Sequence, residues 1–225
     1  MTLFPRKVLA LAVLGLGLTH ISSGQTLLTS VQWNPPAANP VVSGSGTWFT
    51  GNTVNLTTSA VINAGAVFNW DWSAAPFRSG FSLSTTNNSG IAIGVGAGTT
   101  ATQTLTFSSV INSPYLWFNF IDPSTSFNFG AYNWTFLSGN KASRSGSSVI
   151  STGLNASDDG FLIRINQDFG PGTSLNFNYV STGVASTSGF TISTVPEPSA
   201  LSLLAFGLGG WAMARRRLAE SKGFR

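Results

Sequence analysis

The sequence contains no cysteine, and its single histidine, His20, lies near the start of the chain. Disulfide bonds are therefore excluded, so the fold must be stabilised by its core alone. Catalysis by serine–histidine or cysteine–histidine pairs, and metal sites built on histidine, need side chains that the chain after His20 lacks. Both glutamates, Glu197 and Glu220, lie close to the C-terminal end. Catalytic carboxylates in the body of the chain would have to come from aspartates.

Charge is scarce in that body, which we take as residues 25–194. The net charge of +4 and the pI of about 10.0 suggest a binder of nucleic acids or anionic surfaces, but they arise from the two ends. The charged residues of the body are Arg78, Lys141, Arg144 and Arg164, against Asp71, Asp122, Asp158, Asp159 and Asp168. No basic stripe is present to neutralise phosphates. Binding to nucleic acid is therefore excluded.

The N-terminal stretch has the three parts of a secretory signal peptide in the right order. Two basic residues at positions 6–7 precede a short apolar run over residues 8–18, and small residues then lead to Gly24. A buried N-terminal helix is the alternative, but it does not require this order of charge, apolar run and small residues. The sequence predicts a signal peptide over residues 1–24, cleavage between Gly24 and Gln25, and export by the Sec machinery.

The C-terminal stretch combines a glutamate between two prolines, an apolar run and three arginines. Pro196 and Pro198 favour an extended backbone around Glu197. Residues 198–214 would span about 25 Å as a helix, which is marginal for a hydrocarbon core of about 30 Å. The arginines at 215–217 would stay on the cytoplasmic side. We expect a transmembrane helix over residues 198–214 that leaves the body across the inner membrane.

This stretch, VPEPSALSLLAFGLGGWAMARRR, resembles the PEP-CTERM sorting signal of Gram-negative bacteria. The matching positions are Val195, Pro196, Glu197, Pro198, Ser199, Arg215, Arg216 and Arg217. The resemblance implies recognition by exosortase, a membrane transpeptidase, in bacteria that make extracellular polysaccharide. The arrangement is also that of sorting signals in which a hydrophobic C-terminal tail is recognised by an enzyme and then removed. The final LAESKGFR is longer than the family usually shows, and an ordinary single-pass anchor is the alternative.

Between these signals, short runs of alternating apolar and polar residues predict β-strands, with Gly, Ser, Thr and Asn in the turns. The apolar faces of these runs are Phe68, Trp70 and Trp72; Leu105 and Phe107; Phe161, Ile163 and Ile165; and Leu175, Phe177 and Tyr179. Residues 114–121, PYLWFNFI, are apolar on nearly both faces, which indicates a central strand covered on both sides. We expect an all-β domain over residues 25–194, an antiparallel β-sandwich of jelly-roll or immunoglobulin-like type.

A longer segment, TLTFSSVINSPYLWFNFID, resembles more loosely a part common in exported PEP-CTERM bodies. In that pattern, a strand ending in Phe-Ser is followed by a turn and by a second apolar strand that closes on an aspartate. Phe107, Asn112, Pro114 and Asp122 occupy the corresponding places. This resemblance implies a sandwich and no particular activity.

The aspartates offer one weak metal-binding pattern. Asn155, Ser157 and Asp159 stand at the first, third and fifth positions of a loose calcium loop, but its twelfth position is asparagine rather than a bidentate glutamate. A plain Asx turn is the alternative. Asp122 and Asp168 lie in turn sequences, where a carboxylate usually accepts hydrogen bonds from backbone N–H groups. We expect no cofactor.

The body has six tryptophans: Trp33, Trp48, Trp70, Trp72, Trp117 and Trp134. Core packing is the favoured reading because each indole buries a large apolar area, and Trp48 and Trp134 are the best candidates for exposure. The sequence predicts an exported, non-enzymatic surface or extracellular-matrix protein, associated with exopolysaccharide. A carbohydrate-binding module with exposed tryptophans is the main alternative, and a glycan-active enzyme with two aspartates is the weaker one.

Overall fold

The structure is a computed structural model that describes residues 26–34, 43–48, 51–59, 67–69, 72, 75–78, 80–83, 89–153 and 159–195. Within these ranges the chain is all-β, with sixteen strands and the short 3-10 helix η2 (Pro76–Arg78). The predicted signal peptide and the predicted spanning segment 198–214 lie outside them. No helix in the described ranges is long and apolar enough to span a bilayer.

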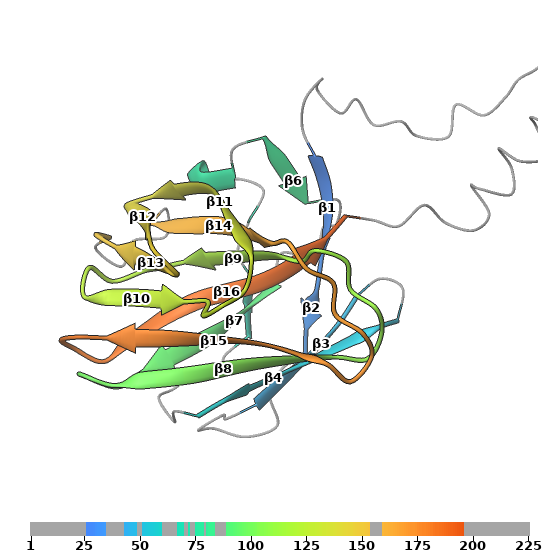
Figure 1. Ribbon diagram of the computed structural model, residues 1–225, viewed down its shortest axis with the longest axis horizontal. Helices are drawn as coiled ribbons and strands as arrows, with labels where there is room; N and C mark the ends of the chain where they lie inside the picture. The colour runs from blue at the N-terminus through green and yellow to red at the C-terminus, as the bar shows by residue number, and fades with distance from the viewer. Residues whose placement is uncertain are drawn as a thin grey trace, which may run out of the picture.

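The strands form two eight-stranded sheets, which overlap in the view of Figure 1. In order across the first sheet are β11 (Trp134–Asn140), β14 (Gly160–Ile165), β9 (Tyr115–Asn119), β16 (Ser186–Thr194), β1 (Thr26–Ser30) and β6 (Phe81–Leu83), while β7 (Ser89–Val95) pairs with β16 and with β5 (Val67–Asn69). The second sheet runs β12 (Ala142–Ser145), β13 (Ser148–Ser151), β10 (Thr125–Asn128), β15 (Ser174–Ser181), β8 (Thr100–Phe107), β4 (Thr53–Thr58), β3 (Ser43–Thr47) and β2 (Gln32–Trp33).

The inner faces of the two sheets share one aromatic core. Phe118 of β9 lies at its centre, stacked on Phe161 with ring centroids 4.5 Å apart and in contact with Phe127 of the second sheet at 4.7 Å. Phe177 and Phe190 close round the same ring at 5.4 and 5.1 Å. The alternation of apolar and polar residues therefore predicted the inward residues of β8, β14 and β15 correctly, because the apolar face of each strand packs against the opposite sheet.

The first sheet is also covered on its outer face. A second cluster contains Trp117 of β9 and Leu162 of β14, packed under Trp72, Ala75 and Phe77. Trp72, Ala75 and Phe77 belong to the segment that carries η2, so this short segment covers part of the outer face of the sheet. All five residues of β9 are buried, which confirms the prediction of a central strand covered on both sides.

Three details differ from the sequence prediction. The run that begins at Phe68 forms a strand only as far as Asn69, and Trp72 is buried in the outer cluster instead of continuing that strand. In addition, β1 and β6 pair in parallel, with Thr26 opposite Phe81, although the other strand pairs are antiparallel. The sixteen described strands also exceed the roughly seven to nine of an immunoglobulin-like domain.

The two ends of the sandwich are distinct. The terminus end is defined by the last residue of β16, the first residue of β1 and the connections Ser108–Pro114 and Asn166–Thr173. Register places them together, because Thr194 pairs with Thr29 and Ser193 with Tyr115. The far end holds the turn between β15 and β16. In Figure 1 the terminus end lies at the right and the far end at the left.

Candidate functional site

The predicted sorting segment follows directly after strand β16. Residues 188–193 are all buried, and the strand ends at Thr194 beside Thr29 of β1. Val195 follows as the first residue outside the sheet, with 49% of its surface exposed. The other predicted sorting and cleavage residues lie outside the described residues: Pro196, Glu197, Pro198, Arg215, Arg216, Arg217, Gly24 and Gln25.

The calcium-loop pattern is described only at Asp159, since Asn155 and Ser157 lie outside the described residues. The Asp159 side chain is 4% exposed and packs against Gly153, where an added Cβ would lie 3.0 Å from its Oδ2 atom. In the described ranges, no cluster of three or more His, Cys, Asp or Glu residues could hold a metal ion. The calcium loop stays a prediction.

Two other aspartates hold the connections between strands. Asp168 accepts a hydrogen bond of 3.1 Å from the Ser113 backbone N–H, which is the turn role that its sequence context predicts. Asp122 instead accepts a hydrogen bond from the Ser186 hydroxyl through Oδ2. Because that hydroxyl gives its hydrogen to Asp122, the bond of 2.7 Å between Tyr179 and Ser186 must be donated by the tyrosine. Burial raises the pKa of Tyr179 well above its ordinary value, and the negative charge of Asp122 adds to that rise.

The tryptophans belong to the core. Trp33, Trp48, Trp72, Trp117 and Trp134 are each at most 5% exposed, which includes the two best candidates for exposure. Their contacts are specific: the indole N–H of Trp117 donates to Ser193 at 2.7 Å, and the guanidinium of Arg144 lies 4.2 Å from the ring centroid of Trp134. Core packing is confirmed for these five. A sugar platform of exposed tryptophans is wrong for them, and Trp70 lies outside the described residues.

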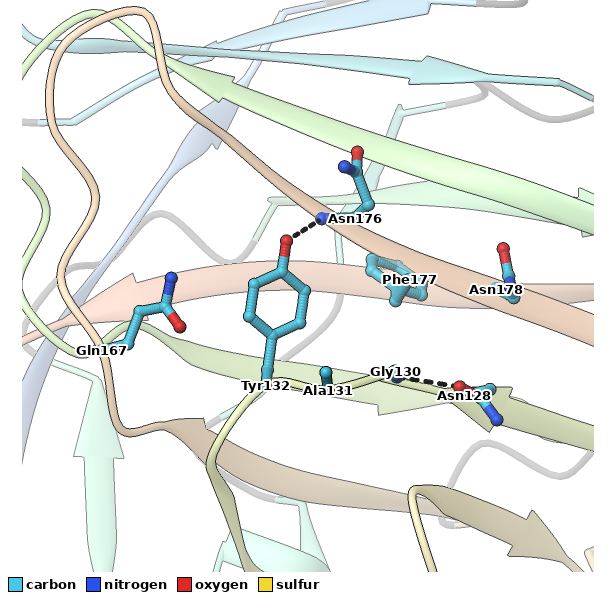
Figure 2. Close-up of a pocket in the computed structure, with 8 residues that line it drawn as sticks. All are labelled: Asn128, Gly130, Ala131, Tyr132, Gln167, Asn176, Phe177 and Asn178. Carbon is cyan, nitrogen blue, oxygen red and sulfur yellow. Dashed lines mark hydrogen bonds between the residues drawn. The ribbon is translucent and has the colours of Figure 1, made fainter.

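A hollow of about 490 Å³ opens on the second sheet, where β10 separates from β15. Figure 2 shows the side chains around it. They are uncharged and rich in amides: Asn128, Gly130, Ala131, Tyr132, Gln167, Asn176, Phe177 and Asn178. The amides and the tyrosine hydroxyl supply donors and acceptors, and the Tyr132 ring supplies an apolar surface.

The hollow exists because one strand pair stops early. β10 pairs with β15 only as far as Asn128 opposite Asn178, and Gly130, with φ of 59°, then turns the chain away. Tyr132 returns to the exposed edge of β15, where its hydroxyl accepts a bond of 3.2 Å from the Asn176 backbone N–H, as Figure 2 shows. The same hydroxyl donates to the Ser174 carbonyl at 3.5 Å. A side chain thus replaces the missing strand.

Sequence reasoning did not single out this hollow. Its residues come from the end of β10 and the loop after it, from the connection after β14 and from β15, so no short motif contains them. The available signal was the alternation in SLNFNYV, which places Asn176 and Asn178 outward. That pattern does not reveal which loop lies beside them.

The comparison with known families confirms the reading of the C-terminal stretch. A model described as the PEP-CTERM protein-sorting motif matches residues 194–217, from the last residue of β16 to the last of the three arginines. No curated protein and no solved structure matches the chain. The motif supports an exported protein whose precursor is anchored in the membrane of a Gram-negative bacterium and is sorted by exosortase. The chain is therefore a protein with a PEP-CTERM sorting motif.

Proposed function

We propose that this protein is a non-enzymatic component of the cell surface or extracellular matrix, associated with exopolysaccharide. The Sec machinery exports it with a signal peptide over residues 1–24, and residues 198–214 hold the precursor in the inner membrane. The single observation that carries the proposal is the continuity of a buried core strand with the matched motif at Thr194. A folded body placed directly before a sorting signal is cargo for the sorting enzyme.

The arrangement of strand ends supports this topology. Thr194 of β16 lies beside Thr29 of β1, and paired strands are about 5 Å apart. The two segments predicted to enter the membrane therefore leave the sandwich at the same end. Exits at the same end are compatible with a domain that folds while both segments remain in the bilayer, because neither connection has to run the length of the sandwich.

The position of Asp168 argues against its use in a pair of catalytic carboxylates. Asp168 follows β14 at the terminus end, whereas Asp122 and Asp159 lie beyond the opposite end of β9 and β14. Five residues of β9 separate the two ends, about 16 Å at 3.3 Å per residue. Paired glycosidase carboxylates lie about 5–10 Å apart, so Asp168 is a poor partner for either.

Deletion of residues 195–217 tests the sorting half of the proposal. The variant is expected to lose processing and to change its destination, as followed by immunoblots of inner-membrane, envelope and medium fractions. Deletion of residues 218–225, beyond the matched motif, is the matched control and should leave both unchanged. Normal processing and destination after loss of residues 195–217 would show that the motif does not direct this protein.

Carbohydrate binding is a second candidate function, and the amide-lined hollow favours it. Sugar hydroxyls pair well with amides, and the Tyr132 ring, which packs on Phe169 with centroids 6.0 Å apart, offers a surface for stacking. Affinity electrophoresis in dextran, mannan and galactan gels tests this with the full chain in detergent. Retardation should be lost in Asn176→Ala and Gln167→Ala and kept in Asn55→Ala. Equal mobility of all variants in every gel would exclude the hollow as a binding site for these neutral glycans.

A further inference from the structure

We infer that the terminus end of the sandwich faces the lipid bilayer in the membrane-anchored precursor, with the far end directed away from it. This inference rests on the proposed membrane insertion of residues 198–214 and adds an orientation to it. Three observations carry it: the length of the chain after β16, the position of β1, and the character of the surface at this end.

The connection to the bilayer is short. From Thr194, the last paired residue, to Pro198, where the predicted spanning segment begins, the chain can reach about 14 Å even when fully extended. The proposed membrane surface therefore lies within about 14 Å of the end of β16. A sandwich held this closely cannot turn its far end toward the lipid without β16 leaving the sheet.

Leaving the sheet would be costly. β16 pairs with β7 over residues 186–190 and with β9 over residues 189–193, and its buried side chains include Phe190 and Ile192. Taking these side chains out of the packed core would leave cavities in it and expose apolar surface to water. The strand therefore stays in place while the tail is anchored.

The first strand sets the same orientation. Because β1 runs antiparallel to β16 with Thr29 opposite Thr194, its first residue, Thr26, extends beyond the end of β16. β6 lies parallel to this part of β1, with Phe81 opposite Thr26. From Leu18 to Thr26 the chain reaches at most about 27 Å, so an uncleaved signal peptide would draw the same end toward the bilayer.

The surface at the terminus end suits the vicinity of lipid headgroups. Within the two connections that define it, the only charged residue is Asp168, and its carboxylate accepts the Ser113 backbone N–H. Val110 is 53% exposed there. The connections are held to each other by paired bonds between Ile111 and Phe169 of 2.8 and 2.9 Å. These two connections, which are nearly uncharged and hydrogen-bonded to each other, lose little hydration energy beside a bilayer.

Two valines provide a matched test. Val110 at the terminus end and Val184 in the turn at the far end are both exposed, by 53% and 64%, and the chain has no cysteine. The variants Val110→Cys and Val184→Cys can each carry one bimane fluorophore on the full chain in liposomes with spin-labelled lipid headgroups. β15 spans about 26 Å between the two ends, so quenching at position 110 should exceed that at position 184 by at least about twofold.

Equal quenching at the two positions, or stronger quenching at position 184, would overturn the orientation while leaving the sorting proposal intact. Flotation of the same liposomes separates the two claims: a full chain that does not float with them contradicts the membrane insertion itself. Gln167→Cys and Ala185→Cys, exposed at the terminus end and the far end, form a second pair that must give the same order. Unchanged unfolding midpoints would show that the labels report on the native fold.

Discussion

The two sheets share one core but differ on their outer faces. On the second sheet, β15 alternates buried Leu175, Phe177 and Tyr179 with outward Asn176 and Asn178. On the first sheet, every residue of β9 is buried, because the η2 segment covers the outer face. The doubly covered sheet contains β16, which leads into the sorting motif. The strand next to the sorting motif thus lies in the doubly covered sheet, whereas the open sheet presents hydroxyls and amides.

The largest expected effect is the loss of stability when either of two neighbouring residues of β9, which face opposite sides of the sheet, is truncated. Phe118→Ala opens the inner core and Trp117→Ala opens the outer cluster, and each should lower the free energy of unfolding by about 3–5 kcal/mol. Urea unfolding followed by circular dichroism measures both. A loss below about 1 kcal/mol in Trp117→Ala would mean that the outer layer does not pack on the sheet.

The next largest loss of stability is expected at Gly160 of β14, which packs closely against the segment that carries η2. A Cβ at Gly160 would lie 2.1 Å from the Phe118 carbonyl oxygen and 2.4 Å from a ring carbon of Phe77. Gly160→Ala should therefore destabilise the fold by about 1–3 kcal/mol through overpacking. Gly170→Ala is the control, because the nearest atom there is 3.8 Å away, and it should cost nothing measurable. Equal unfolding midpoints for the two variants would contradict a tight outer layer.

Alkaline pH tests the inner face of the second sheet. The pKa of Tyr179 is raised in the folded state, mainly by burial, so the unfolded chain loses this proton at a lower pH than the folded one. The contribution of the Tyr179 hydroxyl to the free energy of unfolding is therefore fully present below pH of about 10. Above that pH it falls by up to about 1.4 kcal/mol per pH unit. Urea midpoints between pH 8 and 11.5 should fall less steeply in Tyr179→Phe. Parallel curves for both proteins would refute this.

The smallest loss of stability is expected for substitutions on the exposed outer face of the second sheet. Asn176→Thr replaces an exposed asparagine by a residue that favours strands, and the bond from its backbone N–H to Tyr132 is retained. The free energy of unfolding should stay within about 0.5 kcal/mol of the parent. The next residue in the same strand, Phe177, should cost about 3–5 kcal/mol when changed to alanine. Similar losses at both positions would show that this face is covered as well.

This contrast explains what the sequence could predict. Alternation reveals which face of a strand is buried, so the inward residues of β8 and β15 followed directly, and the apolar run of β9 indicated burial on both sides. Alternation does not reveal what covers an outer face. Trp72 fitted a strand pattern that begins at Phe68, but it packs in the outer cluster with Trp117 and Leu162. The parallel pairing of β1 with β6 depends on residues more than fifty positions apart.

The two candidate sites differ in the same way. The sorting motif is contiguous in sequence, so prolines, apolar run and arginines were recognisable without a structure. The hollow brings Tyr132 to the edge of β15 only because β10 stops pairing at Asn128. Sites made from several loops depend on where strands end, and the ends of strands are poorly determined by the local sequence.

The intact mass of the protein recovered from the cell envelope and medium tests the central claim most directly. The account predicts a polypeptide that begins at Gln25 and has lost the apolar segment 198–214 together with Arg215, Arg216 and Arg217, with any added mass reporting what replaced them. A mass that includes every residue through Phe224 and Arg225 would contradict it, because the C-terminal segment would then be a permanent anchor.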